Sequence, residues 1–206
     1  MRVTPERPLL PMLGSGAPAR ERADAARNRE ALLVAARALV EEHGVAAVTT
    51  EAVAARAGVG KGTVFRRFGS REGLMAALLD HSESAWQASV ITGPPPLGPG
   101  APPLERLLAF GRSRLEATLL HSELISAAGQ SAASSGAPYS FVAMHVRHLL
   151  AELGVSGDLP ILATAILAPL EVPILEQQVR VDGFSVERVY RGWADLVARV
   201  VRPPGA

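Results

Sequence analysis

Residues 49–74 constrain the fold of this chain more strongly than any other stretch, because they encode two short helices joined by a tight turn. The segment reads TTEAVAARAGVGKGTVFRRFGSREGL. Its leading threonines can cap a helix whose inner face carries Val53 and Ala54. Gly58 can end that helix in the left-handed conformation without steric cost, and Val64 lies on the inner face of the next helix. Because the small Ala54 lets the two helices cross closely, the pattern predicts a helix-turn-helix.

Helix caps and helix-breaking segments divide the rest of the chain into further helices, and the sequence predicts an all-α protein. An amphipathic helix is expected over about Asp24–His43, and Ser70 can cap another that runs to about Ser89. The proline-rich segment 93–103 and the polar segment 129–138 interrupt the chain. The remaining expected helices are Leu104–His121, Tyr139–Leu153, Leu159 to about Val181, and Ser185–Val201.

The formal charge of +1 hides an asymmetry along the chain. Residues 1–71 contain 12 basic and 7 acidic residues, whereas residues 72–206 contain 9 basic and 13 acidic residues. A basic end on an otherwise acidic protein is typical of a surface that binds phosphate groups. The chain has no cysteine, which excludes disulfides, thiolate nucleophiles and cysteine-ligated zinc.

Apparent catalytic and metal-binding signals in the sequence fail on inspection. The segment GVGKGT at 58–63 is similar to a phosphate-binding loop, but Ala55 and Gly62 stand where that pattern needs Gly and Ser or Thr. His145 and His148 share a helix face, with no third metal ligand nearby in the sequence. We therefore expect a protein that is not an enzyme and has no cofactor, and we interpret the two histidines as hydrogen-bonding groups rather than metal ligands.

The segments TT, AVA, AGVGKGTVFRRF and SREGL, at these spacings, resemble the DNA-binding domain of the tetracycline-repressor (TetR) family of transcriptional regulators. The resemblance extends from about Arg27 to about Leu79. It implies an N-terminal three-helix DNA-binding domain with a helix-turn-helix, and a C-terminal helical domain for effector binding and dimerisation. The expected boundaries are 1–19 for a disordered N-terminal arm, 20–79 for the DNA-binding domain, and 80–206 for the ligand-binding and dimerisation domain.

The resemblance also implies that a homodimer binds double-stranded DNA through its two recognition helices. Because these helices enter successive major grooves, the operator should be nearly palindromic. Lys61 and Thr63 are placed for base edges and adjacent phosphates, and Thr50 and Arg71 for the phosphate backbone. Phe65 stands where the family usually has Tyr, and Arg67 where His is common, so one phosphate-contacting hydroxyl is absent. The predicted DNA-binding residues are Thr49, Thr50, Gly60, Lys61, Gly62, Thr63, Phe65, Arg66, Arg67 and Arg71.

The last predicted helix carries an apolar stripe that is unusually wide for a terminal helix. Packing of this helix and the preceding one against their symmetry mates gives the four-helix dimer interface that the family resemblance implies. The alternative is that both helices fill the core of a monomer. Pro169 and Pro173 should kink or break the preceding helix. The predicted interface residues are Val189, Trp193, Leu196, Val197 and Val200.

A small, largely apolar effector is expected to bind the C-terminal region and to release a repressor from its operator. The helices Leu104–His121 and Tyr139–Leu153, with the segment around Pro169, can enclose an apolar cavity. The fourth helix, Ser70–Ser89, is expected to be the only rigid connection between that cavity and the helix-turn-helix. The predicted effector-binding residues are Leu107, Phe110, Arg114, Met144, His145, His148, Leu149 and Glu171.

The sequence also gives an expectation for the location of the protein. Residues 1–19 cannot build an apolar run of signal-peptide length, and the run Leu159–Leu170 is too short to cross a bilayer. We therefore expect a cytoplasmic protein without a membrane segment. The alternative function is a helical enzyme or small-molecule carrier whose N-terminal bundle makes protein contacts. Salt-sensitive binding of generic duplex DNA distinguishes a regulator from this alternative.

Overall fold

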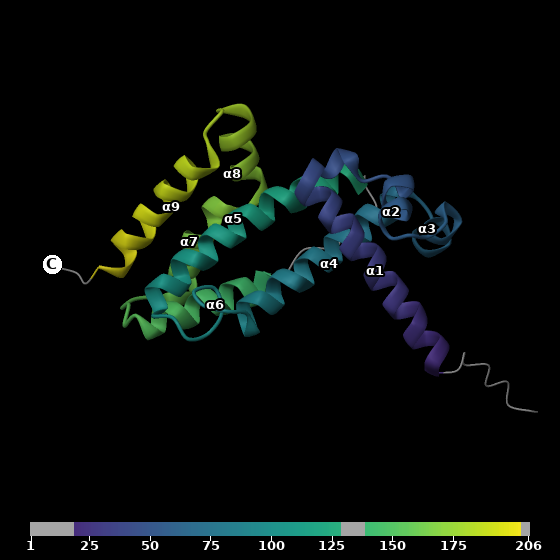
Figure 1. Cartoon of the computed structure of the whole chain (residues 1–206). Coiled ribbons are helices and arrows are strands. Elements are labelled where there is room, and N and C mark those ends of the chain that lie inside the picture. Colours follow the sequence, from purple (N-terminus) through teal and green to yellow (C-terminus); the bar gives the residue numbers. More distant parts are fainter. Residues whose placement is uncertain (1–18, 129–138, 203–206) are drawn as a thin grey trace, which may run out of the picture.

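The computed structural model describes residues 19–128 and 139–202, and within these ranges every regular element is a helix, as predicted (Figure 1). The expected N-terminal arm, apart from Ala19, and the polar segment 129–138 lie outside the described residues. The elements are α1 (Ala19–His43), the 3-10 helix η1 (Val45–Ala47), α2 (Thr50–Arg56), α3 (Lys61–Phe68), α4 (Arg71–Thr92), α5 (Pro103–Ala128), α6 (Tyr139–Glu152), α7 (Leu159–Leu167), the 3-10 helix η3 (Ala168–Leu170), α8 (Val172–Glu176), the π-helix η4 (Gln177–Val181) and α9 (Val186–Val201).

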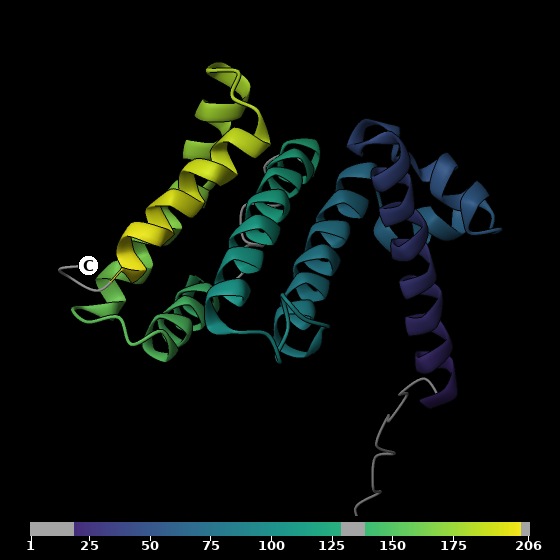
Figure 2. The same ribbon diagram turned by 60° about the vertical axis from the view of Figure 1, so that its left-hand side comes forward.

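Residues 19–79, which we call the head, comprise α1, η1, α2, α3 and the first turns of α4. Their apolar faces meet in one core, where Leu33, Val53 and Val64 are fully buried. Gly44 follows α1 with φ 78°, in the left-handed region that glycine adopts without strain, so α1 ends where the sequence predicts. The head lies at the opposite end of the molecule from α9 (Figure 2).

The C-terminal end of α5 belongs to the core of the head. The sequence predicts that this helix ends at His121, but α5 continues to Ala128. Its added turns bury Leu124 and Ala128 among the residues of the head core. Because this contact ties α5 to the head, the expectation that the fourth helix is the only rigid connection is wrong.

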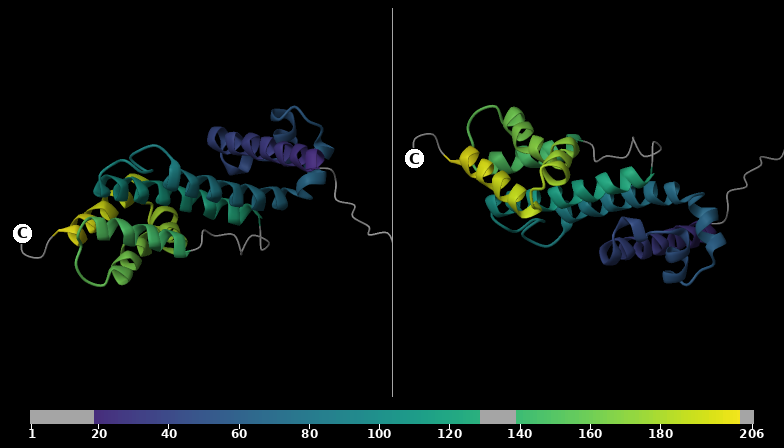
Figure 3. Two further views of the ribbon diagram at one scale, coloured as in Figure 1. Left: turned by 90° about the horizontal axis from the view of Figure 1, so that it is seen from below. Right: turned by 90° about the horizontal axis from the view of Figure 1, so that it is seen from above.

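Helices α4 and α5 form a long antiparallel pair through the centre of the molecule (Figure 3). The remaining helices pack on this pair away from the head: α6 contacts α5 and α7, and both α8 and α9 contact α5. The second core, at this end, contains Trp86 of α4, Phe110 of α5, Leu149 of α6 and Ile166 of α7. The α4–α5 pair therefore connects two separate cores.

The apolar segment Leu159–Val181 folds as separate pieces rather than as one helix. Helix α7 ends at Leu167, and Glu171 has an extended backbone (φ −79°, ψ 147°) between η3 and α8. Pro169 and Pro173 each occupy one of the first two positions of the following helix, where a missing N–H costs little. The predicted break at these prolines is confirmed.

By length and composition alone, the same segment is apolar enough to cross a membrane, although the shorter run Leu159–Leu170 is not. The interruption at Glu171 leaves no single continuous helix of that length. Only 28% of the most apolar window of the segment is buried inside the subunit, so the segment also presents apolar surface outward.

The apolar stripe of α9 is divided between the core of the subunit and its surface. Trp193 is only 2% exposed, donates a hydrogen bond from Nε1 to the Ile166 carbonyl oxygen at 2.8 Å, and packs against Gly111 of α5. Val189 and Val197 are buried on the same face. These three stripe residues pack mainly in the subunit core, although Val189 and Trp193 also line a surface groove with Leu196. The two predicted residues that stay partly exposed are Leu196 and Val200.

The substitution Gly111→Ala tests the packing of α9 on α5. A Cβ atom at Gly111 would overlap the Trp193 ring, and overpacking of this kind costs about 1–3 kcal/mol. This cost opposes the gain of up to about 1 kcal/mol from replacing Gly within a helix. We therefore expect a lower midpoint of urea unfolding, followed by circular dichroism.

The matched control for this measurement is Gly62→Ala in α3, where an added Cβ meets nothing within 4 Å. Its unfolding midpoint should stay unchanged or rise. If both variants raised the midpoint equally, the close contact between α9 and α5 would be contradicted.

Candidate functional site

Local capping sets the geometry of α2 and α3. The Thr49 hydroxyl accepts a hydrogen bond from the Ala52 backbone N–H at 3.0 Å and caps α2, so Thr50 is the first helical residue. Gly58 follows α2 with φ 67°, and Gly60 precedes the first residue of α3. The helix-turn-helix predicted from the sequence is therefore present.

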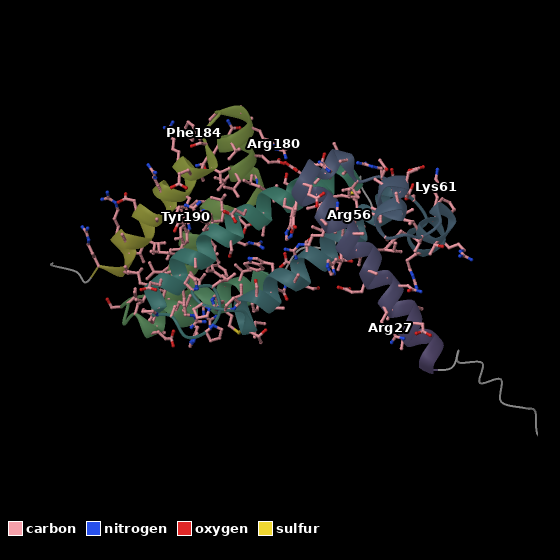
Figure 4. All side chains as sticks on the ribbon, in the orientation of Figure 1. Arg27, Arg56, Lys61, Arg180, Phe184 and Tyr190 are labelled. Carbon is pink, nitrogen blue, oxygen red and sulfur yellow. The ribbon has the colours of Figure 1, made fainter. Side chains whose placement is uncertain are left out.

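Helix α3 turns one face into the head and the other to solvent. Val64 is fully buried, Thr63 is half-buried, and the Phe65 ring is 58% exposed. In Figure 4, Lys61 lies at the end of the molecule that is far from Tyr190 on α9. The exposed members of the predicted DNA-binding set on α3 are Lys61, Gly62, Phe65, Arg66 and Arg67.

Glu51 is a residue of this surface that the sequence reasoning missed. Its carboxylate forms an ion pair with the Lys61 ammonium and accepts a hydrogen bond from the Thr50 hydroxyl at 2.9 Å. The hydrogen bond from Lys61, together with those from its own backbone N–H and from Thr50, lowers the pKa of Glu51 to about 2. The only lysine of the chain thus has an acidic partner before DNA arrives. The sequence did offer one signal for this pair, because Glu51 directly follows the threonines predicted to cap α2.

Two predicted phosphate contacts also hold the head together. Arg71 is half-buried and donates from Nε to the Val48 carbonyl oxygen at 3.1 Å. Arg67 donates from Nη2 to the Ala25 carbonyl oxygen of α1 at 2.5 Å. Within residues 19–128 and 139–202, neither guanidinium forms an ion pair, and Arg66 forms no side-chain hydrogen bond or ion pair. Positive charge therefore remains on this surface although two of its side chains are anchored.

The predicted effector-binding residues do not meet around one cavity. Three of them, Leu107, Phe110 and Leu149, are fully buried in the second core. Met144 and His148 are exposed on α6, so they cannot line an internal site, which corrects that part of the prediction. Glu171 lies at the break between η3 and α8. The periodicity of a helix does not show which of its faces another helix covers, and this is why the set mixes core and surface residues.

Two polar members of that set, His145 and Arg114, pack against other side chains of the subunit. His145 lies among the aromatic rings of the second core, and burial lowers its pKa to about 4. Arg114 lies over the Trp86 ring and 3.7 Å from a carboxylate oxygen of Glu83. The Nδ1 atom of His121 is 3.2 Å from the same oxygen. Sequence reasoning missed Glu83 and His121, because nothing in the sequence indicates that α4 and α5 bring them together.

The comparisons with known proteins agree with this geometry. Residues 32–78 match the family described as bacterial regulatory proteins, tetR family. The structure is similar to a TetR-family transcriptional regulator from Pectobacterium atrosepticum, with 21% identity, a TM-score of 0.57, and 88% of this chain and 95% of that chain covered. It is also similar to reduced NemR from E. coli, with 20% identity, a TM-score of 0.56, and coverages of 87% and 100%. No curated protein sequence matches the chain.

Residues 32–78 are a TetR-family DNA-binding domain. This domain is that of bacterial DNA-binding transcriptional regulators, a family of regulators rather than enzymes. The match favours a regulator over the alternative of a helical enzyme or carrier whose N-terminal bundle makes protein contacts. The matched residues lie entirely in the head, so the match concerns DNA binding and gives no information on the effector.

The pairing of Glu51 with Lys61 predicts that Glu51→Gln strengthens the binding of generic duplex DNA by this protein. The substitution removes one negative charge from the DNA-facing surface and frees Lys61 for a phosphate. We expect severalfold tighter binding at low salt, and a plot of log affinity against log salt that is steeper by about 0.9. Fluorescence anisotropy over a salt series measures both.

The control is Glu42→Gln, which removes the same charge but frees Arg56 at the C-terminal end of α2. Its effect should be smaller. Equal effects of the two variants would mean that only the net charge of the head matters, and the specific role of the Glu51–Lys61 pair would be wrong. Lowering the pH to 5 should not mimic Glu51→Gln, because a carboxyl with a pKa of about 2 is still ionised there.

Proposed function

We propose that this protein is a homodimeric TetR-family repressor, which binds a nearly palindromic operator and leaves it when a small, largely apolar effector binds. The observation that carries the DNA-binding part is the outward face of α3, where basic side chains surround an exposed aromatic ring. As a regulator of transcription, the protein is expected to act in the cytoplasm. The proposed division is a DNA-binding domain at 20–79 and a ligand-binding and dimerisation domain at 80–206.

Several kinds of DNA contact are proposed for the head. Lys61 and Thr63, in the first turn of α3, are placed for base edges in the major groove. The unpaired Arg66 supplies charge for a phosphate. Gly60 and Gly62 leave the backbone open, since a Cβ atom at either would meet nothing within 4 Å, and phosphate oxygens can approach their N–H groups. The other proposed contacts are Thr49, Thr50, Phe65, Arg67 and Arg71.

The proposed dimer interface is the outward face of the C-terminal helices. Ile161 on α7 is 65% exposed, and Val181 at the end of η4 is 71% exposed, which is unusual for large apolar side chains. Gly192 and Leu196 of α9 line a groove beside Pro169. An added Cβ at Gly192 would meet nothing within the subunit, so a helix of a second subunit can approach α9 closely there. This face extends the predicted interface from the stripe of α9, whose Val189 and Trp193 line the same groove, to α7 and η4.

Selection of bound sequences from random duplex DNA, followed by affinity measurements on two variants, tests the proposed DNA contacts. Lys61→Ala should relax the preference at one operator position by about 1–3 kcal/mol, because it removes a base contact. Arg66→Ala should weaken binding evenly across sequences and reduce the salt slope by about 1. Arg71→Ala is unsuitable, since its loss also removes the hydrogen bond to Val48 that holds the head together. Two variants that bind the selected operator like the parent would contradict the assignment of α3 as the recognition helix.

The substitution Ile161→Glu tests the proposed dimer. A charge at this exposed position leaves the subunit core intact but puts an unpaired carboxylate into the interface, where desolvation is costly. We expect monomers in sedimentation velocity, with unchanged helical content by circular dichroism. The control is Ile91→Glu on α4, which adds the same charge at a position 53% exposed outside the proposed interface and should leave the dimer intact. A dimeric Ile161→Glu variant would place the interface elsewhere.

A further inference from the structure

A groove of about 420 Å³ runs along the seam between α4 and α5 and reaches α1 of the head. The seam is hollow because small side chains face one another across it. These are Ser82, Ala85 and Ser89 from α4, and Ser113 and Ala117 from α5. Protein interiors are otherwise packed almost without voids, so a hollow of this size between two long helices is open to an occupant.

Apolar side chains line most of the groove and connect it to the head. Trp86 and Leu120 line it between α4 and α5, and Val40 contributes from α1. Leu124 lines the groove as well and belongs to the core of the head. An occupant would therefore touch the head and both long helices at once.

Apart from the Ser82 hydroxyl, which can donate or accept, the free polar groups of the groove are hydrogen-bond acceptors. His121 is 7% exposed, and its Nδ1 faces a Glu83 carboxylate oxygen at 3.2 Å. Burial, and then the charge of Arg114, lowers the pKa of His121 to about 4, so the ring is neutral at pH 7. A proton on Nδ1, on the side of the carboxylate, leaves Nε2 as an acceptor. Glu116 adds an exposed carboxylate that has no partner among the described residues.

The cationic side chains at the groove already have acidic partners. The Nε atom of Arg37 lies 2.8 Å from a carboxylate oxygen of Glu41, and Arg114 lies 3.7 Å from Glu83. Once these ion pairs are taken into account, Glu116 is the charged side chain of the described groove lining that has no counterion. A carboxylate and a neutral imidazole acceptor together favour an occupant that is positive and donates hydrogen bonds, and they disfavour an anion.

We propose that this groove binds an elongated organic amine, with an apolar body and one protonated nitrogen, and that the bound amine holds the head in one position relative to α5. The apolar body lies along Trp86 and Leu120, and the ammonium group bonds to His121 and Glu116. This inference rests on the proposed release of DNA by a small effector and names the site and chemical class of that effector. It replaces the cavity predicted between α5 and α6.

Three ten-carbon molecules that differ only in their head group test the proposal on the full chain: decylammonium, decan-1-ol and decanoate. Isothermal titration calorimetry in the absence of DNA measures their binding below the concentrations at which they aggregate. We expect saturable binding of decylammonium, weaker binding of decanol and the weakest binding of decanoate. Decanoate binding as tightly as decylammonium, or no saturable binding of decylammonium, overturns the proposal.

Variants of the groove locate the binding. Ala117→Leu and Ser82→Leu fill it from opposite helices, and each should weaken decylammonium binding by about tenfold or more. Glu116→Gln should weaken it by about 2- to 5-fold and leave decanol unaffected, because the carboxylate is exposed. The control is Glu105→Gln, which removes an exposed carboxylate from the first turn of the same helix and should change nothing. Parent-like binding by both filled variants, each with native helical content, overturns the site.

Measurements with DNA separate this inference from the proposed function. Decylammonium should change the operator affinity of the parent, and the Ala117→Leu variant should bind operator within a few fold of the parent but no longer respond. If the unliganded parent binds no operator, the proposed function fails, although the calorimetry still decides whether the groove takes amines. If decylammonium binds the groove but leaves operator affinity unchanged, the coupling to the head is wrong while DNA binding stands.

Discussion

The insertion of the C-terminal end of α5 into the core of the head is the contact on which the rest of the structure depends. Leu124 and Ala128 are buried there together with residues of α1, α2, α3 and α4. Exposing a fully buried leucine costs about 1.5–3 kcal/mol, so the head cannot separate from α5 freely. Both long helices therefore cross from one core to the other. A change in the second core reaches the head as a shift of the α4–α5 pair, and not as the swing of α4 alone.

On the DNA-facing side, most basic side chains of the head have partners before DNA is present, and Arg66 is the exception among those on α3. Lys61 is paired with Glu51, Arg56 with Glu42, and Arg67 and Arg71 donate to backbone carbonyl oxygens. Binding to DNA is then largely an exchange of partners, in which a phosphate at any of these four side chains must compete with an existing contact. Such an exchange lowers the affinity for arbitrary DNA more than for a site where additional base contacts form. The pairing thus favours discrimination between sequences over affinity for all of them.

Signals within a few residues of one another predicted most of the fold correctly. The caps Thr49 and Ser70, the left-handed Gly58 and the breaking prolines at 169 and 173 each act on their own backbone, so the sequence alone is sufficient. Contacts between distant segments were not predictable in this way. The sequence pattern of the apolar stripe of α9 is the same whether Trp193 packs on Gly111 or on a second subunit. Only the close approach of α5 shows that Trp193 packs on Gly111. The hollow seam between α4 and α5 is missed for the same reason, because small side chains on two helices say nothing about their alignment.

The energetics of the groove set how small a rearrangement suffices to move the head. Shifting a two-state equilibrium from 1:99 to 99:1 takes about 5.5 kcal/mol of preferential binding, or about 3 kcal/mol for each groove of the proposed dimer. At about 25 cal/mol per Å² of apolar surface, the share of one groove, half of the total, corresponds to roughly 110 Å² of additional apolar contact in the favoured arrangement. That area is comparable to one large apolar side chain. Since Leu124 lines the groove and anchors α5 in the head, a change in its contacts alone reaches this scale, without unfolding or large domain motion.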